Sequence, residues 1–225
     1  MRLFMAGRIS SRSDRPFSQM EPLASGHAWI PPRFRAALFG LGRQRACAEI
    51  PVRLILALVQ LEPPDTHHLR AAIGWLELGS PVEAGEDIAR IAPEFLEHPD
   101  VLEVRWEICA KGRSWEAALH VAEALVRVAP ERSSGWVHRA YAMRRVRHGG
   151  LQLAWSLLRP AVEMFSKEDV IPYNLACYAA QEGRLDAAWD WLQKSIAVCG
   201  DARVIRQRAL GDADLQPLWD RVRKL

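Results

Sequence analysis

The sequence lacks any apolar run that is long enough to cross a membrane. A transmembrane helix needs about 18 or more consecutive apolar residues, and the longest candidate, residues 54–61, is far shorter. Cysteine is also scarce. The four cysteines are widely spaced and form no CxxC pair. These absences argue against a disulfide framework and a zinc ribbon. Cys109 and Cys177 fall on apolar helical faces, so we expect buried thiols that pack as small hydrophobic side chains.

Catalytic motifs are absent as well. The sequence contains no P-loop, no GxGxxG after a strand, no HExxH and no GxSxG, which are the motifs of nucleotide-binding sites, zinc proteases and serine hydrolases. The histidines are scattered, and the adjacent His67 and His68 point to different sides of a helix, so they cannot easily share a metal ion. We therefore predict a protein that is not an enzyme, with no catalytic residue, no cofactor and no metal.

Charge is unevenly distributed along the chain. Residues 1–62 carry nine arginines and four acids, a formal balance of +5. The other residues carry 21 basic and 23 acidic side chains, a balance of −2. The overall charge of +3 therefore comes from the N-terminal segment, and the main part of the chain shows no bias toward nucleic acid.

Residues 1–64 also differ from the rest in composition, since they are rich in arginine, serine and proline. Their pattern allows helical pieces around residues 33–41 and 52–61, but it shows no repeat. Three interpretations stay open: a poorly ordered basic tail, a mitochondrial-type targeting peptide in residues 1–20, and a segment upstream of the native start of translation. We treat residues 1–64 as a poorly ordered basic segment.

From Asp65 onward, apolar residues recur at helical spacing in pairs of segments joined by short polar turns. In the second segment of each pair, small residues stand where two helices would cross, at Gly85, Ala118, Ala154 and Ala188. Their steps are 33, 36 and 34 residues. A pair of helices that repeats every 34 residues or so predicts a helical solenoid. Pro93 and Pro160 are expected to end or kink the second helix of the first and third pairs.

The fourth pair carries the clearest motif, because residues 173–195 read YNLACYAAQEGRLDAAWDWLQKS. Asn174-Leu175-Ala176, Gly183, Leu185 and Ala188 match the pattern of the tetratricopeptide (TPR) repeat. The chain therefore resembles the TPR family, and in particular its bacterial members with a YNLACY repeat and a C-terminal cap. The resemblance covers residues 65–201 and implies an all-α, right-handed solenoid of about four antiparallel helix pairs. Residues 202–225 would then form a C-terminal cap over the last apolar face.

Two further groups of residues have both a structural and a functional interpretation. The tryptophans from Trp75 to Trp219 recur once or twice per repeat, and we expect them to be buried between helices. A basic cluster stands at the end of the first helix of the third pair, at Arg139, Arg144, Arg145, Arg147 and His148. This cluster fits a solvated helix C-terminus or a site for an acidic peptide.

The resemblance also implies where a partner would bind, because TPR solenoids line their concave face with the first helix of each pair. The matching positions here are Arg70, Glu103, Glu107, Arg139, Met143, Arg147, Tyr173, Asn174 and Gln181, with Glu77, Lys111 and Cys177 beside them. Asn174 stands where many TPRs use asparagine to hold a peptide backbone. Too few positions match the clamp with which chaperone-binding TPRs hold a terminal carboxylate, so we do not expect one.

The resulting groove would be acidic at the second pair, basic at the third, and polar and aromatic at the fourth. We therefore expect a cytoplasmic scaffold or adaptor that binds a peptide or helix of another protein, and neither nucleic acid nor membranes. Two alternatives remain. One is a structural repeat protein that self-associates as a homodimer, and the other is a small-molecule binder or enzyme built on a helical solenoid.

Overall fold

The computed structural model describes residues 60–225, and every regular element in that range is helical. In chain order the elements are α3 (Asp65–Glu77), α4 (Pro81–Ile88), η2 (Pro93–Phe95), α5 (Pro99–Lys111), α6 (Trp115–Val128), α7 (Ser133–Met143), α8 (Leu151–Leu158), α9 (Ala161–Met164), α10 (Val170–Gln181), α11 (Leu185–Cys199), α12 (Ala202–Leu210), η3 (Ala213–Leu218) and α13 (Trp219–Val222). Within the described range no helix has the length and apolar character of a membrane span. The three interpretations of the N-terminal tail concern residues that lie outside this range, apart from its last few positions.

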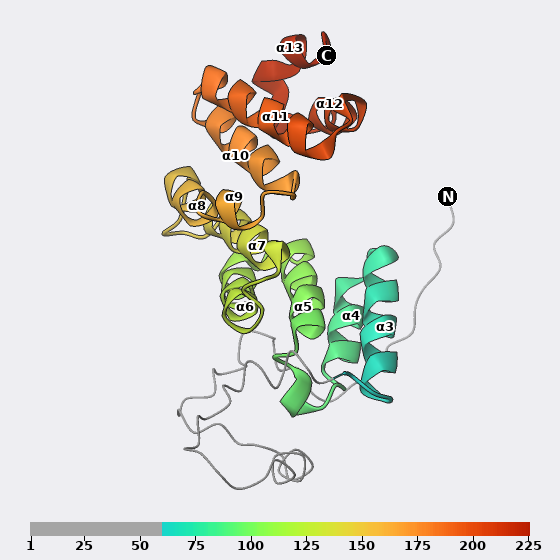
Figure 1. The fold of residues 1–225 in the computed structure, drawn as a ribbon. Coiled ribbons are helices and arrows are strands. Elements are labelled where there is room, and N and C mark those ends of the chain that lie inside the picture. The colour runs from blue at the N-terminus through green and yellow to red at the C-terminus, as the bar shows by residue number, and fades with distance from the viewer. Residues whose placement is uncertain (1–59) are drawn as a thin grey trace, which may run out of the picture.

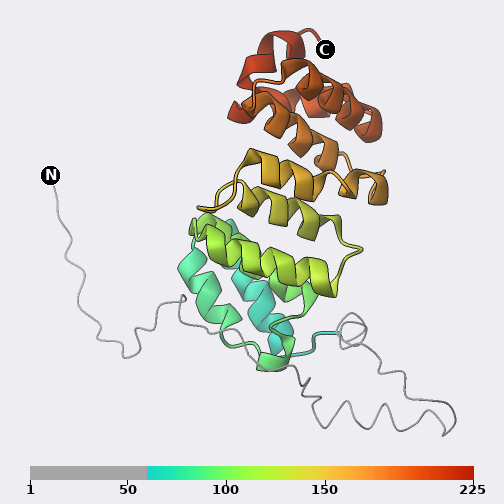
Figure 2. The same cartoon turned by 90° about the vertical axis from the view of Figure 1, so that its left-hand side faces the viewer.

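The helices form antiparallel pairs that stack one after another (Figure 1, Figure 2). The pairs are α3 with α4, α5 with α6, α7 with α8 and its continuation α9, and α10 with α11. The first helices also touch one another in sequence, α3 with α5, α5 with α7, and α7 with α10. We call the surface of α3, α5, α7 and α10 the first-helix side. The predicted all-α solenoid of about four helix pairs is confirmed.

Glycine is required at two turns of the solenoid. Gly183, directly after the fourth pair's first helix, has a φ of +75°, a left-handed conformation that glycine adopts without steric cost. This confirms its predicted role as the stop of that helix. At Gly149, between α7 and α8, an added Cβ would lie 1.7 Å from the carbonyl oxygen of Met143. Any larger residue there would have to move the backbone.

Fully buried alanines mark the helix crossings. Ala118, Ala154 and Ala188 are buried, as their spacing predicts. The prediction for Gly85 is wrong, because Gly85 is partly exposed and an added Cβ would meet no atom within 4 Å. Its neighbour Ala84 is fully buried instead and packs in the same cluster as the apolar residues of α3. Adjacent residues point about 100° apart on a helix, so an error of one position moves the contact to another face.

The two helix-breaking prolines behave differently. Pro160 interrupts the second helix of the third pair as predicted, since α8 ends at Leu158 and α9 begins at Ala161. Proline lacks the amide hydrogen that the helix needs and its ring clashes with the preceding turn. Pro93 is not the residue that ends α4, because α4 already ends at Ile88 and Pro93 begins the short helix η2.

Most of the tryptophans pack between helices. Trp106 and Trp191 are buried, and Trp155 meets Trp191 edge-on with ring centroids 5.8 Å apart. Trp75 is an exception to the predicted burial, because 39% of it is exposed. Its indole N–H donates a hydrogen bond of 3.0 Å to the buried Asp87. The polar edge of this ring is therefore anchored on the first pair while the rest of the ring reaches solvent.

The C-terminal elements cover the fourth pair. Leu215, Leu218 and Val222 are at most 1% exposed and belong to the same core cluster as the buried residues of α10 and α11. Burial of apolar surface is the main favourable term in such a contact. It also brings Asp212 and Asp214, at the start of η3, against the first-helix side.

Replacing Ala84 with leucine should destabilise the protein. Extra carbon atoms in a packed helix crossing cost about 1–3 kcal/mol. The neighbouring change Gly85→Ala enters open space and removes a glycine from a helix, so it should stabilise the protein by up to about 1 kcal/mol. Denaturant unfolding followed by circular dichroism measures both effects. If Ala84→Leu left the free energy of unfolding unchanged and Gly85→Ala lowered it, Gly85 rather than Ala84 would be the residue at the helix crossing.

Candidate partner-binding surface

The residues expected to bind a partner are spread along the first-helix side. They are placed as follows: Arg70 on α3, Glu103 and Glu107 on α5, Arg139 and Met143 on α7, Arg147 in the turn after it, and Tyr173, Asn174 and Gln181 on α10. They fall into three environments. The fourth pair is covered by the C-terminal elements, the third pair is largely engaged in internal contacts, and the first two pairs enclose an open pocket.

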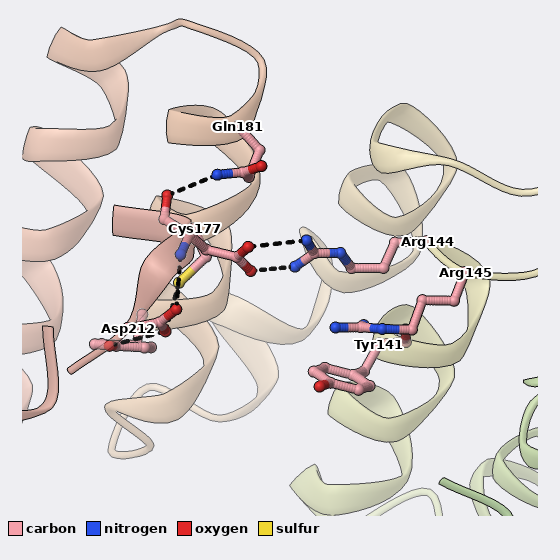
Figure 3. A network of polar contacts seen from close by, with 8 residues as sticks. Tyr141, Arg144, Arg145, Cys177, Gln181 and Asp212 are labelled. Carbon is pink, nitrogen blue, oxygen red and sulfur yellow. Dashed lines mark hydrogen bonds and ion pairs between the residues drawn. The ribbon is translucent and has the colours of Figure 1, made fainter. Parts of the chain in front are cut away.

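At the fourth pair, the chain's own C-terminal segment lies on α10 (Figure 3). Asp212 accepts a hydrogen bond of 3.1 Å from the hydroxyl of Tyr173, and the thiol of Cys177 lies 3.5 Å from the same oxygen. One turn further on, the side-chain amide of Gln181 donates to the carbonyl of Asp214 at 3.0 Å. Tyr173, Cys177 and Gln181 are four residues apart and share one face of α10. The C-terminal segment therefore follows that face along most of the helix.

Arg144 closes this contact from the third pair (Figure 3). Its guanidinium donates two hydrogen bonds to the carboxylate of Asp214, one of them of 3.1 Å. It also lies over the ring of Tyr178, 5.5 Å from the ring centroid. Burial acts to lower the pKa of Arg144, but the hydrogen bonds and charge of Asp214 outweigh burial and hold that pKa above its usual value. Because the two residues are 70 positions apart in the sequence, no local sequence pattern predicts this ion pair.

The other arginines of the basic cluster are partly engaged. The guanidinium of Arg139 lies 4.8 Å from the ring centroid of Trp136, and that of Arg145 lies 3.5 Å from the ring centroid of Tyr141. Burial lowers the pKa of both guanidinium groups. Arg147 is exposed. Arg139, Arg144 and Arg145 of the basic cluster, which is a predicted site for an acidic peptide, thus already contact aromatic rings or an acidic segment of their own chain.

Two further candidates make internal contacts. Met143 is partly buried and packs against the core cluster that holds α10. The side-chain amide of Asn174 donates a hydrogen bond of 2.9 Å to the carbonyl of Val170, one turn earlier in the same helix. The amide that would hold a peptide backbone by analogy with the TPR family is therefore engaged within α10.

Cys177, Asp212 and Asp214 place a thiol and two carboxylates within 4.8 Å of one another, measured between potential ligand atoms. The carboxylates already accept hydrogen bonds from Tyr173, Cys177 and Arg144, so a metal ion would have to displace a cation. Burial, and after it the charge of Asp212, raises the pKa of the Cys177 thiol far above its usual value. A thiol with so high a pKa is neutral at physiological pH.

An open pocket of about 580 Å³ lies between α3 and α5, within the size range of ligand sites. We call it the α3–α5 pocket. Its floor is apolar and its rim is charged: the lining residues are Leu69, Ile73, Leu76 and Val104 below, and Glu77, Asp100, Glu103, Glu107 and Lys111 around the edge. Four carboxylates against one ammonium group make the rim acidic. Two of the residues expected to bind a partner, Glu103 and Glu107, thus lie on the rim of one pocket with an apolar floor.

Several groups in this pocket are available to a partner. Glu77 and Glu107 are exposed, and neither carboxylate makes a hydrogen bond or ion pair with any other residue of the described range 60–225. Asp100, in contrast, pairs with Arg132 at 2.7 Å. Ile73 on the floor is 41% exposed. An exposed apolar side chain beside unpaired carboxylates suits a ligand with apolar and cationic side chains.

Glu103 fixes one wall of the pocket by joining the second pair to the third. Its carboxylate accepts a hydrogen bond from the hydroxyl of Ser134 and lies 2.9 Å from Nε2 of His138. The His138 ring stacks on Trp106 with centroids 3.7 Å apart. Burial acts to raise the pKa of Glu103, but the hydrogen bonds from His138 and Ser134 outweigh it, so that pKa lies below its usual value.

Comparison with known proteins supports the fold. No protein-family model and no curated protein matches the sequence. Among solved structures, the MamA RS-1 ArsTM double mutant is similar with a TM-score of 0.52 and 16% identity, over 61% of this chain and 76% of that chain. YrrB, a TPR protein with an unusual peptide-binding site, is similar with a TM-score of 0.48 and 14% identity, over 69% of this chain and 82% of that chain. MamA is also a TPR protein, and the likeness to it shows that this chain has a TPR-type fold.

The change Asp214→Asn should loosen the C-terminal elements. It removes the charge that pairs with the largely buried Arg144, and we expect a loss of about 1–3 kcal/mol in the free energy of unfolding. Amide hydrogen exchange in α12, η3 and α13 should become faster. The control is Asp220→Asn, because the Asp220–Arg223 pair is exposed and such pairs contribute little. Equal effects of the two substitutions would contradict the assigned role of Asp214.

The contribution of Glu103 to stability should depend on pH. Since its pKa in the folded protein is depressed, that contribution is complete above the ordinary value of 4.5 and is lost as pH falls through the folded-state pKa. Glu103→Gln should therefore lower the free energy of unfolding by about 1–2 kcal/mol at pH 7, and the gap should narrow as pH falls below 4.5. Urea unfolding across this range measures it. Glu107→Gln, on the next turn of α5, is the control, and a pH-independent gap for Glu103→Gln would refute the prediction.

Proposed function

Taking the TPR-type fold as premise, we propose that the protein is an interaction scaffold that binds a cationic, amphipathic segment of another protein in the α3–α5 pocket. One observation carries this proposal: the exposed Ile73 lies in one pocket with Glu77 and Glu107, whose carboxylates pair with no residue between positions 60 and 225. Apolar side chains of the ligand would cover Ile73, and its cationic side chains would meet the two carboxylates. The sequence predicts a binding groove along all four helix pairs, and the proposed binding site is limited to the first two pairs.

An acidic ligand fits this chain less well. Arg144 is already paired with Asp214, and Arg139 and Arg145 lie on aromatic rings. An acidic peptide would have to compete with contacts that the folded chain already makes. The rim of the α3–α5 pocket, in contrast, includes the exposed carboxylates of Glu77 and Glu107, which pair with no residue of the range 60–225. Complementary charge at this rim would speed association and make it sensitive to salt.

Self-association is the second candidate function, because apolar side chains are exposed beside the turn that joins α3 to α4. Leu78 is 75% exposed and Val82 is 71% exposed. They flank the short Gly79-Ser80 turn and so lie close together at the start of the solenoid. A second copy could cover them, since solenoid ends with apolar surface need a partner or a cap to remain soluble. This candidate predicts a homodimer and leaves the α3–α5 pocket free.

The test of the first proposal uses a labelled 13-residue peptide of arginine, leucine and phenylalanine at helical spacing, with fluorescence anisotropy as the readout. Reversing two pocket charges, Glu77→Lys with Glu107→Lys, should weaken binding at least tenfold, because each lost and reversed contact is worth about 1 kcal/mol. Raising the salt concentration from about 50 to 300 mM should weaken binding to the unmodified protein.

The matched control reverses Glu86 and Glu123, which are exposed on the second helices α4 and α6. This variant has the same net charge as the pocket variant and should bind the peptide as the unmodified protein does. Equal losses in both variants would show that only overall charge matters and would refute the pocket. Absence of binding, together with a dimer mass that falls to that of a monomer in Leu78→Glu, would favour self-association.

A further inference from the structure

The chain itself contains a sequence of the kind that the α3–α5 pocket fits. Residues 33–45 read RFRAALFGLGRQR, with four arginines and no acidic residue. Phe34, Leu38 and Leu41 stand at i, i+4 and i+7, a spacing that places apolar side chains on one side of a helix. The segment is therefore both cationic and amphipathic, and it belongs to the N-terminal stretch that carries the basic excess of the chain.

We propose that residues 33–45 occupy the α3–α5 pocket of the same molecule when no partner is bound. This inference rests on the proposed function, since it assigns the same class of ligand to the same pocket. Apolar side chains of the segment would cover Ile73, and its arginines would pair with Glu77 and Glu107. The segment is then an internal competitor that a partner must displace.

The connection between the segment and the pocket is long enough for this contact. Residues 46–59 provide a linker of 14 residues between the segment and Gln60, the first described residue. A chain of 14 residues spans about 20 Å as a helix and at most about 50 Å when fully extended. α3 begins five residues after Gln60 and has 13 residues, which makes it roughly 20 Å long. The pocket beside α3 is thus within reach of the segment.

Another hollow of the described surface offers a poorer match. It has a volume of about 240 Å³ and lies near α9 and the ends of α10 and α11, with Glu168 and Lys194 among its lining residues. One carboxylate beside one ammonium group gives no net charge to attract four arginines. This hollow is formed by the last two helix pairs, whereas α3, which begins five residues after Gln60, lies in the first pair at the other end of the stack (Figure 1). Charge and reach therefore both favour the α3–α5 pocket.

A tethered segment need not bind tightly to occupy the pocket. A linker of this length gives an effective concentration of about 1 mM. If the free segment binds with a Kd of about 100 μM, the tethered copy fills the pocket roughly nine-tenths of the time. An added ligand would then bind about tenfold more weakly than it would to an empty pocket.

The experiment uses a fluorescein-labelled peptide of residues 33–45 and the full chain in three forms. The forms are the unmodified protein, a segment variant with glutamate at positions 33, 35, 43 and 45, and a control variant with glutamate at positions 2, 8, 12 and 15. The two variants replace the same number of arginines. We expect the peptide to bind the segment variant about tenfold more tightly than the other two proteins, and amide exchange in α3 and α5 to be faster in the segment variant alone.

The outcomes separate this inference from the function on which it rests. Equal peptide affinity for all three forms, with loss of binding in Glu77→Lys/Glu107→Lys, would uphold the pocket as a binding site and overturn its internal occupation. Absence of peptide binding to every form, with unchanged exchange in α3 and α5, would overturn the inference, while the proposed function would still be decided by the peptide of arginine, leucine and phenylalanine. Protection that grows with protein concentration would place the segment of a second copy in the pocket and would also overturn it.

Discussion

The ion pair between Arg144 and Asp214 determines which part of the solenoid surface is left for a partner. It holds the start of η3 against the third and fourth helix pairs, where Tyr173, Cys177 and Gln181 complete the contact. The apolar residues of the cap supply most of the stabilisation, since Leu215 and Leu218 are almost fully buried. The polar contacts add direction, because each hydrogen bond fits only one placement of the cap. Arg144, which could otherwise bind an external acidic ligand, is thereby used within the chain.

The fold could be predicted from the sequence because it depends on local and periodic signals. Ala118, Ala154 and Ala188 recur at the solenoid period, and Gly183 stands where the helix must end. The first repeat shows the limit of such signals. Gly85 and Ala84 are both small, and only the packing of α4 against α3 selects Ala84 for the crossing. Composition cannot make that choice, because the two residues differ by one position and by about 100° around the helix.

The candidate site could be predicted only in part, and for a physical reason. Glu103 and Glu107 follow from their places on the first helix of the second pair, which the repeat pattern determines. The contacts that modify the site join residues 31 to 70 positions apart, such as Ser134 to Glu103 and Arg144 to Asp214. These contacts depend on side-chain positions in the folded stack. Ile73 illustrates the same limit, because it lies at the edge of the apolar stripe of α3 and its 41% exposure becomes visible only in three dimensions.

An internal ligand would change the affinity that a partner shows in the proposed interaction. A partner must overcome the effective concentration of the tethered segment, so a partner whose Kd for the empty pocket is about 1 μM would show an apparent Kd of about 10 μM. The tethered segment and the partner would both bind through arginines that pair with carboxylates of the pocket. Salt would therefore weaken both affinities, and the ratio of the two affinities would change less than either one. Apolar contact with Ile73 is less sensitive to salt. A partner with a larger apolar side chain at that point would therefore gain over the tethered segment, and specificity would reside in the floor of the pocket rather than in its charged rim.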